Sequence, residues 1–419
     1  MNKICVLGLG YIGLPTASIL ATHNFKVIGV DVNTEVVETI NNGGIHIKEP
    51  GLNTLVQAAI KSGNLVVHTK LERAYAFIIT VPTPLENKRR RANLKYVKSA
   101  AESIVPYLER NNLVILESTV PPKTTEELLV PILEQSRLKA GEDFYLAHCP
   151  ERVLPGNILK EIIENDRIIG GINPESAAKA KALYSRFVSG AIYLTDATTA
   201  ELVKVMENTY RDVNIALANE LSQICTKLGL NVWEVIELAN KHPRVNVLRT
   251  GPGVGGHCLA VDPWFVVEKA PQEAKLIRLS REINDSQPQF VIDMIEEMVK
   301  GVINPKVTVL GVTYKANMDD TRESPATTII SGLKKRGYRL GIYDPHVKNF
   351  EYELSGLKEA FKDSDCAVLV TDHNEFKSLS PERLGQFMRT KQVIDTRHIF
   401  DLKKWQEAGF QAKLLGKSE

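Results

Sequence analysis

The sequence predicts an α/β protein in which two doubly wound parallel sheets, one near each end of the 419-residue chain, are joined by a long central helix and a helical region. Short apolar strands alternate with helical segments in the first and last thirds, which is typical of parallel sheets. Residues 199–228 contain no proline or glycine and show apolar residues at helical spacing, which predicts one long helix. We therefore expect three parts, at residues 1–196, 197–300 and 301–419.

The composition is that of an ordinary globular protein, with a net charge of +2. This balance argues against a nucleic-acid-binding surface, and the basic run at residues 88–91 is expected to be a solvated loop. The apolar runs are too short for a transmembrane helix, and the N-terminus has a strand pattern rather than a signal peptide. The five cysteines include no CxxC pair, so we expect a reducing, cytoplasmic setting and no metal site.

The first third contains a complete dinucleotide-binding pattern. An apolar strand, Lys3–Leu7, runs into Gly8-Leu9-Gly10-Tyr11-Ile12-Gly13, a helical pattern follows, and a second strand, Lys26–Val30, ends in Asp31. The three glycines permit a tight turn, the approach of a pyrophosphate to the backbone, and close packing of helix on strand. A carboxylate at Asp31 would bind a ribose 2′-hydroxyl and repel a 2′-phosphate. The pattern predicts a Rossmann-like domain that binds NAD rather than NADP.

Three further strands in this domain end in polar residues. Thr83 follows the strand at 75–81, Thr119 follows the strand at 113–116, and Glu151 follows the strand at 145–148. Because ligands bind at the carboxyl ends of parallel strands, we expect these three side chains to share one crevice. The alternative is that the threonines only cap helices.

The last third repeats this order in a degenerate form. A strand at Lys306–Leu310 is followed by Gly311, a helix, and a second strand that ends in Asp344. This copy lacks GxGxxG and has Lys315 instead, so a lysine would contact the phosphates of a bound nucleotide. The alternative is a structural domain with a surface lysine.

One face of the predicted central helix carries cations and an amide. Lys204, Asn208 and Arg211 follow one another at intervals of four and three residues, with Glu201 on the same side. Such a face suits an anionic ligand or a developing oxyanion, although a solvated surface would look similar.

A glycine-rich loop contains the strongest candidate for covalent chemistry. Four glycines lie within residues 251–256 and let the backbone approach a substrate, and Cys258 and Asp262 follow at once. Cys5, Cys225 and Cys366 lie in apolar runs and are expected to be small buried hydrophobic residues. A helix beginning near Cys258, together with Lys204, would stabilise a thiolate, so the pattern favours Cys258 as a nucleophile.

These motifs occur in the order found in the UDP-glucose/GDP-mannose dehydrogenase family, which the whole chain resembles. The resemblance implies oxidation of a primary alcohol of a nucleotide sugar with two NAD⁺ and one water. Residues 149–156, 206–214, 242–246 and 255–264 are most similar to the branch that acts on UDP-N-acetyl-D-mannosamine. Ala260 and Val261 depart from the UDP-glucose branch and Leu154 from the UDP-N-acetylglucosamine branch, which remain the alternatives.

The resemblance also implies roles for individual residues. Cys258 would carry a thiohemiacetal and then a thioester, and Lys204 and Asn208 would stabilise the negative oxygen. Residues implied to bind and activate water are Asp262, Thr119 and Glu151. Residues implied to contact NAD are Tyr11, Ile12, Asp31, Thr83, Thr119 and Arg322. Residues implied to bind the UDP-sugar are Arg152, Val153, Lys204, Asn208, Arg211, His242, Arg244, Gly255, Tyr314, Lys315 and Arg397. A homodimer is implied in which Arg244 enters the active site of the neighbouring subunit.

Two other hypotheses stay open. A two-electron dehydrogenase of the 3-hydroxyacid or 6-phosphogluconate type would also pair a Rossmann-like domain with helices, but it would not need Cys258. A nucleotide-sugar sensor would keep the fold without the catalysis, and the intact set of Cys258, Lys204, Asn208 and Asp262 argues against it.

Overall fold

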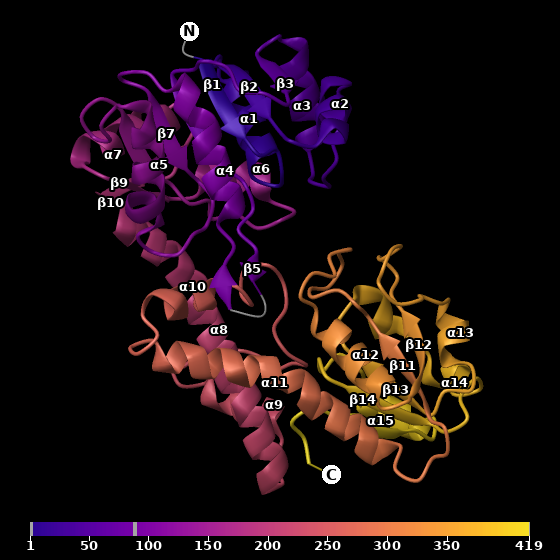
Figure 1. Cartoon of the computed structure of the whole chain (residues 1–419). Helices are drawn as coiled ribbons and strands as arrows, with labels where there is room; N and C mark the ends of the chain where they lie inside the picture. Colours follow the sequence, from indigo (N-terminus) through magenta and orange to yellow (C-terminus); the bar gives the residue numbers. More distant parts are fainter. Residues whose placement is uncertain (1–2, 87–89, 419) are drawn as a thin grey trace. The chain divides into compact units, whose positions relative to one another are not determined.

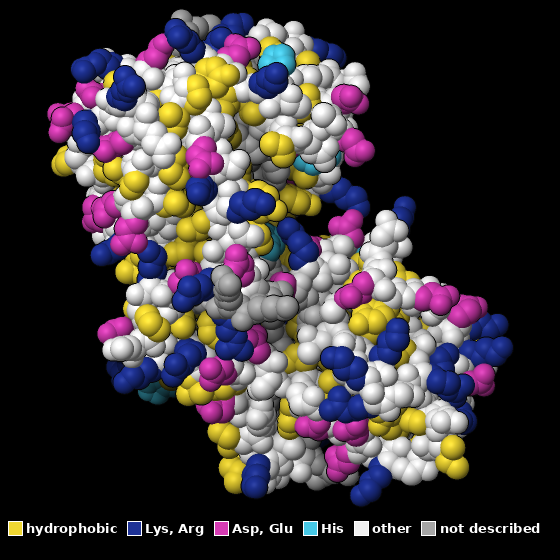
Figure 2. Space-filling view, in the orientation of Figure 1, with side chains coloured by type: hydrophobic (Ala, Val, Ile, Leu, Met, Phe, Trp, Pro, Cys, Tyr) yellow, Lys and Arg dark blue, Asp and Glu magenta, His cyan; other side chains and the backbone are white. Residues whose placement is uncertain are grey.

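The computed structural model describes residues 3–86 and 90–418. The chain divides into two compact units (Figure 1). The N-terminal unit comprises residues 1–207 and 264–271, and the C-terminal unit comprises residues 208–263 and 272–419. Half of the basic run at residues 88–91, expected to be a solvated loop, lies outside the described residues, and the other half, Arg90 and Arg91, is exposed. On the face shown in Figure 2, acidic and basic side chains are interspersed over the N-terminal unit, as the small net charge predicts.

The N-terminal unit is built on an eight-stranded sheet of order β10-β9-β8-β7-β4-β1-β2-β3. All its pairs are parallel except β8 with β9. The strands are β1 (Lys3–Leu7), β2 (Lys26–Val30), β3 (Leu65–His68), β4 (Ala76–Ile79), β7 (Leu113–Leu116), β8 (Tyr145–His148), β9 (Arg167–Gly171) and β10 (Ile192–Asp196). A short hairpin, β5 (Leu85–Glu86) and β6 (Arg91–Ala92), follows β4. Strand β1 lies between β2 and β4, which places the glycine motif at the end of an interior strand of the sheet.

Helices cover both faces of this sheet because alternate residues of each strand point to opposite sides. Ile4 and Val6 pack into one apolar cluster with α1, whereas Cys5 and Leu7 pack into another with α4 and α5. The helices are α1 (Gly13–Thr22), α2 (Thr34–Asn41), α3 (Leu52–Lys61), α4 (Lys95–Ile104), α5 (Val130–Leu133), α6 (Ile158–Glu164) and α7 (Pro174–Tyr184), with a π-helical turn at Thr125–Leu129. The expected doubly wound architecture is confirmed.

The C-terminal unit contains a five-stranded parallel sheet of order β12-β11-β13-β14-β15. Its strands are β11 (Lys306–Leu310), β12 (Arg339–Tyr343), β13 (Cys366–Leu369), β14 (Gln392–Asp395) and β15 (Gln411–Leu414). Its helices are α12 (Pro325–Lys335), α13 (Leu357–Phe361), α14 (Pro381–Leu384) and α15 (Leu402–Glu407). Strand β11 lies between β12 and β13, as β1 lies between β2 and β4, so the predicted second copy is present.

The predicted central helix is a single helix, α8 (Ala197–Leu228), of 32 residues. It starts directly after β10 and is followed by α9 (Val232–Ala239), α10 (Asp262–Lys269) and α11 (Lys275–Met298). Glu201 does not belong to the exposed polar face of α8 that the spacing predicts. It is fully buried and accepts hydrogen bonds from the backbone N–H and the hydroxyl of Thr125, at 2.7 and 2.6 Å. Within the described residues, no helix is long and apolar enough to span a membrane.

Candidate active site

The glycine motif forms a turn with an open backbone at the carboxyl end of β1. Gly8 has φ of +90°, and its N–H donates to the carbonyl of Val30 at 2.8 Å. A Cβ on Gly13 would lie 1.8 Å from the carbonyl oxygen of Gly8, so only glycine lets α1 pack this closely. A Cβ on Gly10 would meet no atom of the described chain within 4 Å. The loop therefore leaves space at Gly10, where a pyrophosphate would approach.

Asp31 lies beside this loop with its carboxylate partly used. One oxygen accepts from the N–H of Leu9 at 2.9 Å, and the other accepts from the N–H of Asn33 at 2.9 Å. Each carboxylate oxygen has a further lone pair for a ribose hydroxyl. Helix α1 has no side-chain cap, so its first N–H groups remain available to an anion. These features fit an NAD molecule, with Tyr11 and Ile12 on the same loop.

Of the three polar strand ends, two lie in direct contact. The hydroxyl of Thr83 donates to the carbonyl oxygen of Thr119 at 2.7 Å. Glu151 instead forms a buried ion pair with Arg167 at 2.6 Å and accepts from the N–H of Arg152 at 2.8 Å. Each oxygen of Glu151 thus already accepts one hydrogen bond, and the side chain is buried at 7% exposure, so a water bound there would use the remaining lone pairs.

Two charged residues in the first half of α8, Lys204 and Glu207, interact with the segment around the end of β8. Arg152 forms an ion pair with Glu207 at 2.6 Å, and Val153 packs against the apolar core. Burial, reinforced by the positive charge of Lys204, lowers the pKa of His148 to about 3. His148 is therefore neutral at pH 7, and Lys204 lies near enough to act on it electrostatically.

In the C-terminal unit, Cys258 lies close to two other predicted residues. The backbone N–H of Asp262 donates to the carbonyl of Cys258 at 2.8 Å, and the amide of Asn208 donates to the Asp262 carboxylate at 2.6 Å. Helix α10 begins at Asp262, four residues later than a helix that would start at Cys258. The thiol therefore precedes the first turn instead of capping it.

Cys5, Cys225 and Cys366 are buried, as their apolar context predicts. Cys258 is exposed, whereas Cys5, Cys149, Cys225 and Cys366 are buried. Burial raises the pKa of Cys5 to about 11 and of Cys149 to about 12, which keeps these thiols protonated and unreactive. Cys258 is thus the accessible thiol.

The glycine-rich loop is held against several predicted substrate residues. A Cβ on Gly255 would lie 2.8 Å from the Cβ of Tyr314, and a Cβ on Gly251 would lie 2.8 Å from a guanidinium nitrogen of Arg397. The N–H of Gly256 donates to the carbonyl of Arg322 at 3.1 Å. The glycines were expected to make room for a substrate, and the structure shows that they also make room for these neighbours. Lys315, next to Tyr314, is exposed.

Three other predicted residues lie outside this contact set. Arg211 is exposed on α8, and His242 and Arg244 are exposed in the loop after α9. The N–H of Arg244 donates to Nδ1 of His242 at 3.3 Å. The guanidinium of Arg322 pairs with Asp320 at 2.6 Å, so an NAD contact by Arg322 would compete with that ion pair.

The comparisons with known proteins identify the family. Residues 2–188 match the NAD binding domain of the UDP-glucose/GDP-mannose dehydrogenase family, residues 198–286 its central domain, and residues 308–402 its UDP binding domain. The chain belongs to this family. It is therefore an NAD-dependent nucleotide-sugar dehydrogenase whose substrate is a UDP-sugar.

Similar family members share nearly the full length of the chain. The chain is 53% identical to a UDP-N-acetyl-D-mannosamine dehydrogenase from Methanococcus vannielii, over 99% of this chain and 97% of the relative. It is 48% identical to an NDP-N-acetyl-D-galactosaminuronic acid dehydrogenase from Ralstonia nicotianae, over 96% and 97%. The solved structure of a UDP-D-ManNAc dehydrogenase from Pyrococcus horikoshii superposes with a TM-score of 0.93 at 43% identity, covering 99% of each chain.

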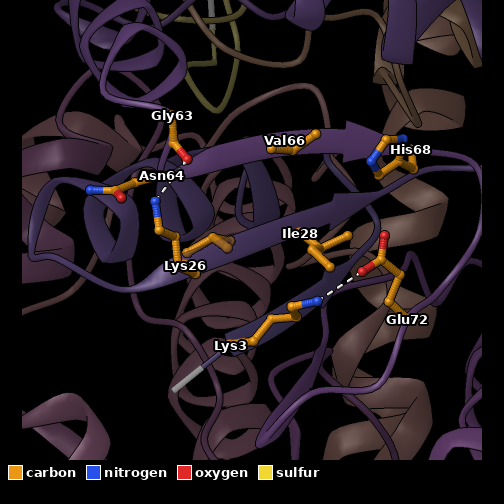
Figure 3. Close-up of a pocket in the computed structure, with 9 residues that line it drawn as sticks. Lys3, Lys26, Ile28, Gly63, Asn64, Val66, His68 and Glu72 are labelled. Atoms are coloured by element: carbon orange, nitrogen blue, oxygen red, sulfur yellow. Dashed lines mark hydrogen bonds and ion pairs between the residues drawn. The ribbon is translucent and has the colours of Figure 1, made fainter. Parts of the chain in front are cut away.

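Two other features of the structure, a cluster of possible metal ligands and a surface hollow, do not resemble ligand sites. Side-chain atoms of His346, His373 and Glu375 lie within 4.8 Å of one another, as metal ligands would. However, Nδ1 of His373 accepts from the N–H of Asn317 at 2.9 Å and Nε2 donates to Asp344 at 3.0 Å, so no lone pair is left for a metal. A hollow of about 190 Å³ is lined by Lys3, which pairs with Glu72 at 2.8 Å (Figure 3). No predicted site residue lines it.

The sequence reasoning missed a buried polar cluster between α8 and α11. Asp212, Asn219, Arg281 and Asn284 are each at most 1% exposed. Asp212 and Asn219 are seven residues apart on α8, on its buried side. Polar residues at buried helical positions were the available signal, because a buried polar side chain needs a specific partner.

Proposed function

We propose that this enzyme oxidises C6 of UDP-N-acetyl-D-mannosamine to the uronate, with two NAD⁺ and one water, through covalent intermediates on Cys258. The observation that carries the proposal is the position of Cys258, which is the one exposed thiol among five and precedes Asp262 in a chain with an NAD binding and a UDP binding domain. The substrate follows from the 53% identical relative of that specificity. The 48% identical relative makes a galactosamine-derived sugar the second candidate.

The reaction requires two oxidations at one carbon. NAD⁺, when bound, would accept one hydride in each of the two oxidation steps, and in the first step the C6 hydroxyl would also lose its proton to a base. After the first, the Cys258 thiolate adds to the aldehyde carbon, and the resulting oxyanion takes a proton to give a thiohemiacetal. Loss of that proton and of the second hydride leaves a thioester. Water then adds to the thioester carbon and the thiolate leaves, which releases the uronate and frees Cys258.

The side chains on α8 would stabilise the oxygen at each stage. Asp262 accepts one N–H of the Asn208 amide, which fixes the orientation of that amide and leaves its second N–H for a ligand oxygen. Lys204 lies one helical turn before Asn208 and would add a positive charge. Asp262 is 3% exposed, so its charge acts in a site with little water. We assign Thr119 and Glu151 to water binding on the family pattern alone.

We further propose that the working form is a homodimer. Apolar side chains at seven-residue intervals on α8 are exposed: Tyr210 at 66%, Leu217 at 52% and Ile224 at 45%. Leu276 and Leu279 on α11 are exposed at 65% and 53%. A second copy would bury this face, and the exposed Arg244 loop of each subunit would then serve the other. Sedimentation of wild type against Leu217→Glu tests this proposal, and a monomeric wild type with full activity would refute it.

We also propose that the enzyme works in the cytoplasm. All five cysteines are free, and a reducing compartment maintains unpaired thiols. An active Cys258 needs that state, since oxidation would remove the nucleophile.

NADH yield against a limiting sugar tests the function. About two NADH per UDP-N-acetyl-D-mannosamine, with little from the galactosamine, glucosamine or glucose analogues, is the expected result. About two NADH from another sugar would keep the mechanism and change the substrate. One NADH or none from every sugar would refute the role of Cys258.

A further inference from the structure

The buried polar cluster of Asp212, Asn219, Arg281 and Asn284 forms one continuous network. Arg281 donates to the Asp212 carboxylate at 2.5 Å, and the Asn284 amide donates to the same carboxylate oxygen at 2.8 Å. The Asn219 amide donates to the side-chain oxygen of Asn284 at 2.9 Å. The network therefore joins α8 to α11 within the C-terminal unit.

The two ends of this network reach the two ends of the glycine-rich loop. The side-chain oxygen of Asn219 accepts from the N–H of Gly251 at 3.0 Å and from the hydroxyl of Thr250 at 2.9 Å. Arg281 makes a longer contact, 3.4 Å, with the carbonyl oxygen of Leu259, the residue after Cys258. The segment from Gly251 to Leu259 is thus held at its start and at its end by side chains of the same network.

Folding stability does not explain why this network is ionic. A buried ion pair loses the hydration of both charges, and an apolar pair of similar volume is often as stable or more stable. Asp212 Oδ2 and Arg281 Nε are buried without a hydrogen-bond partner among the described residues, which adds to the cost. The polar network has one advantage over an apolar replacement: hydrogen bonds depend on direction and select one geometry, whereas apolar contacts accept several.

We propose that Asp212, Asn219, Arg281 and Asn284 are positioning residues that set the geometry of the Gly251–Leu259 loop and so aim the Cys258 thiol at the aldehyde carbon. This inference rests on the covalent role of Cys258 in the proposed function. The effect on rate would be large, since a misplacement of about 1 Å in a reacting group can cost on the order of 100-fold.

A double variant separates positioning from stability. In Asp212→Leu with Arg281→Met, both charges are replaced by apolar groups, so we expect an unfolding temperature within a few degrees of wild type or higher. We expect kcat to fall at least about tenfold, while KM for NAD⁺ changes less than about twofold. Asn219→Leu should lower kcat in the same way, because it releases Gly251.

Gln287→Leu is the matched control. Gln287 is fully buried on α11, accepts from Gln223 at 2.9 Å and donates to the hydroxyl of Ser222 at 3.3 Å, so its hydrogen bonds bridge the same two helices and do not involve the loop. Its kcat should stay within about twofold of wild type. If the double variant is folded and as active as the control, the positioning role is refuted.

A second measurement does not depend on turnover. Cys258 is the exposed thiol, so its rate of alkylation by iodoacetamide reports the geometry of the loop directly. We expect a change of at least about threefold in the double variant and none in Gln287→Leu. Equal alkylation rates would overturn the proposal even if the wild type proved inactive on every sugar, a result that would refute the proposed function separately.

Discussion

The two sheets of this enzyme start their ligand loops in the same way. Gly8 has φ of +90° and donates to Val30, and Gly311 has φ of +86° and donates to Tyr343, at 2.8 and 2.9 Å. In each copy the next residue donates its N–H to the acid that ends the neighbouring strand. The distances are 2.9 Å for Asp31 and 2.8 Å for Asp344.

The two copies differ in the side chain found four residues after the strand next to β1 or β11, and in how far the acid, Asp31 or Asp344, is buried. The residue four positions beyond the last residue of β4 is Thr83, which bonds to Thr119 and leaves Asp31 partly exposed. The corresponding residue beyond β13 is His373, which is fully buried and donates to Asp344. The side chain at this position thus distinguishes an acid that stays partly exposed, Asp31, from an acid that is buried against an imidazole, Asp344. His373 also accepts from Asn317, so the pair fixes the segment that carries Tyr314 and Lys315.

The variant with the largest expected effect distinguishes the covalent chemistry at Cys258 from the binding of NAD⁺ and of the UDP-sugar. Cys258→Ser should lower uronate formation on the order of 1,000-fold or more, because a serine hydroxyl is a far weaker nucleophile than a cysteine thiolate. Binding of NAD⁺ and of the UDP-sugar, measured by calorimetry, should change less than about twofold. Cys225→Ser, a buried cysteine of α8, should remain active. Undiminished turnover in Cys258→Ser would refute the covalent mechanism.

A matched pair of acid variants tests the comparison directly. Asp31→Asn should raise KM for NAD⁺ about tenfold and improve the use of NADP⁺, because a charge-assisted hydrogen bond contributes about 1.5–3 kcal/mol. Asp344→Asn should raise KM for the UDP-sugar and leave KM for NAD⁺ unchanged. Steady-state kinetics with each substrate varied distinguishes these results. A higher KM for NAD⁺ in Asp344→Asn would contradict the division of roles.

Substitutions at the two equivalent positions, Thr83 and His373, should have smaller effects. His373→Leu removes two hydrogen bonds and should raise KM for the UDP-sugar about fivefold, since each bond contributes about 1 kcal/mol or less. Thr83→Val should raise KM for NAD⁺ about threefold. Glu375→Gln, which touches His346 at the surface, is the control and should behave as wild type. Equal effects of His373→Leu on both KM values would mean that His373 has only a structural role.

The effect that leaves the kinetics aside is a difference in the pH dependence of stability. Burial raises the pKa of Glu117 in the N-terminal unit to about 7, although nearby Arg167 opposes it. A carboxyl whose pKa is raised on folding is more protonated in the native state, so its contribution falls as pH rises from about 4.5 to about 7, by up to about 3 kcal/mol. Glu117→Gln should flatten the unfolding temperature over this range.

Asp344 should show the opposite sign. Burial opposes its ionisation, but hydrogen bonds from His373 and from the N–H groups of Val312 and His346 outweigh this and lower the pKa of the carboxyl. Its contribution is therefore present above about pH 4 and is lost as pH falls below it. Thermal unfolding of Asp344→Asn should match wild type most closely at the acid end of the pH range.

For the Glu117 prediction, identical pH profiles for Glu117→Gln and wild type would contradict the assignment of a raised pKa to Glu117.

The sequence by itself determined the two sheets, the long helix and the residues at the ends of the strands. These depend on local features: strand and helix periodicity, and glycines at positions such as Gly8 and Gly311 that need positive φ. The tertiary structure alone decided which partner each polar group received. Asp344 meets His373, Glu151 meets Arg167, and Asn208 meets Asp262 only after distant segments pack together. A buried charge takes whichever partner the fold brings within about 3 Å, and local periodicity contains no information about that partner.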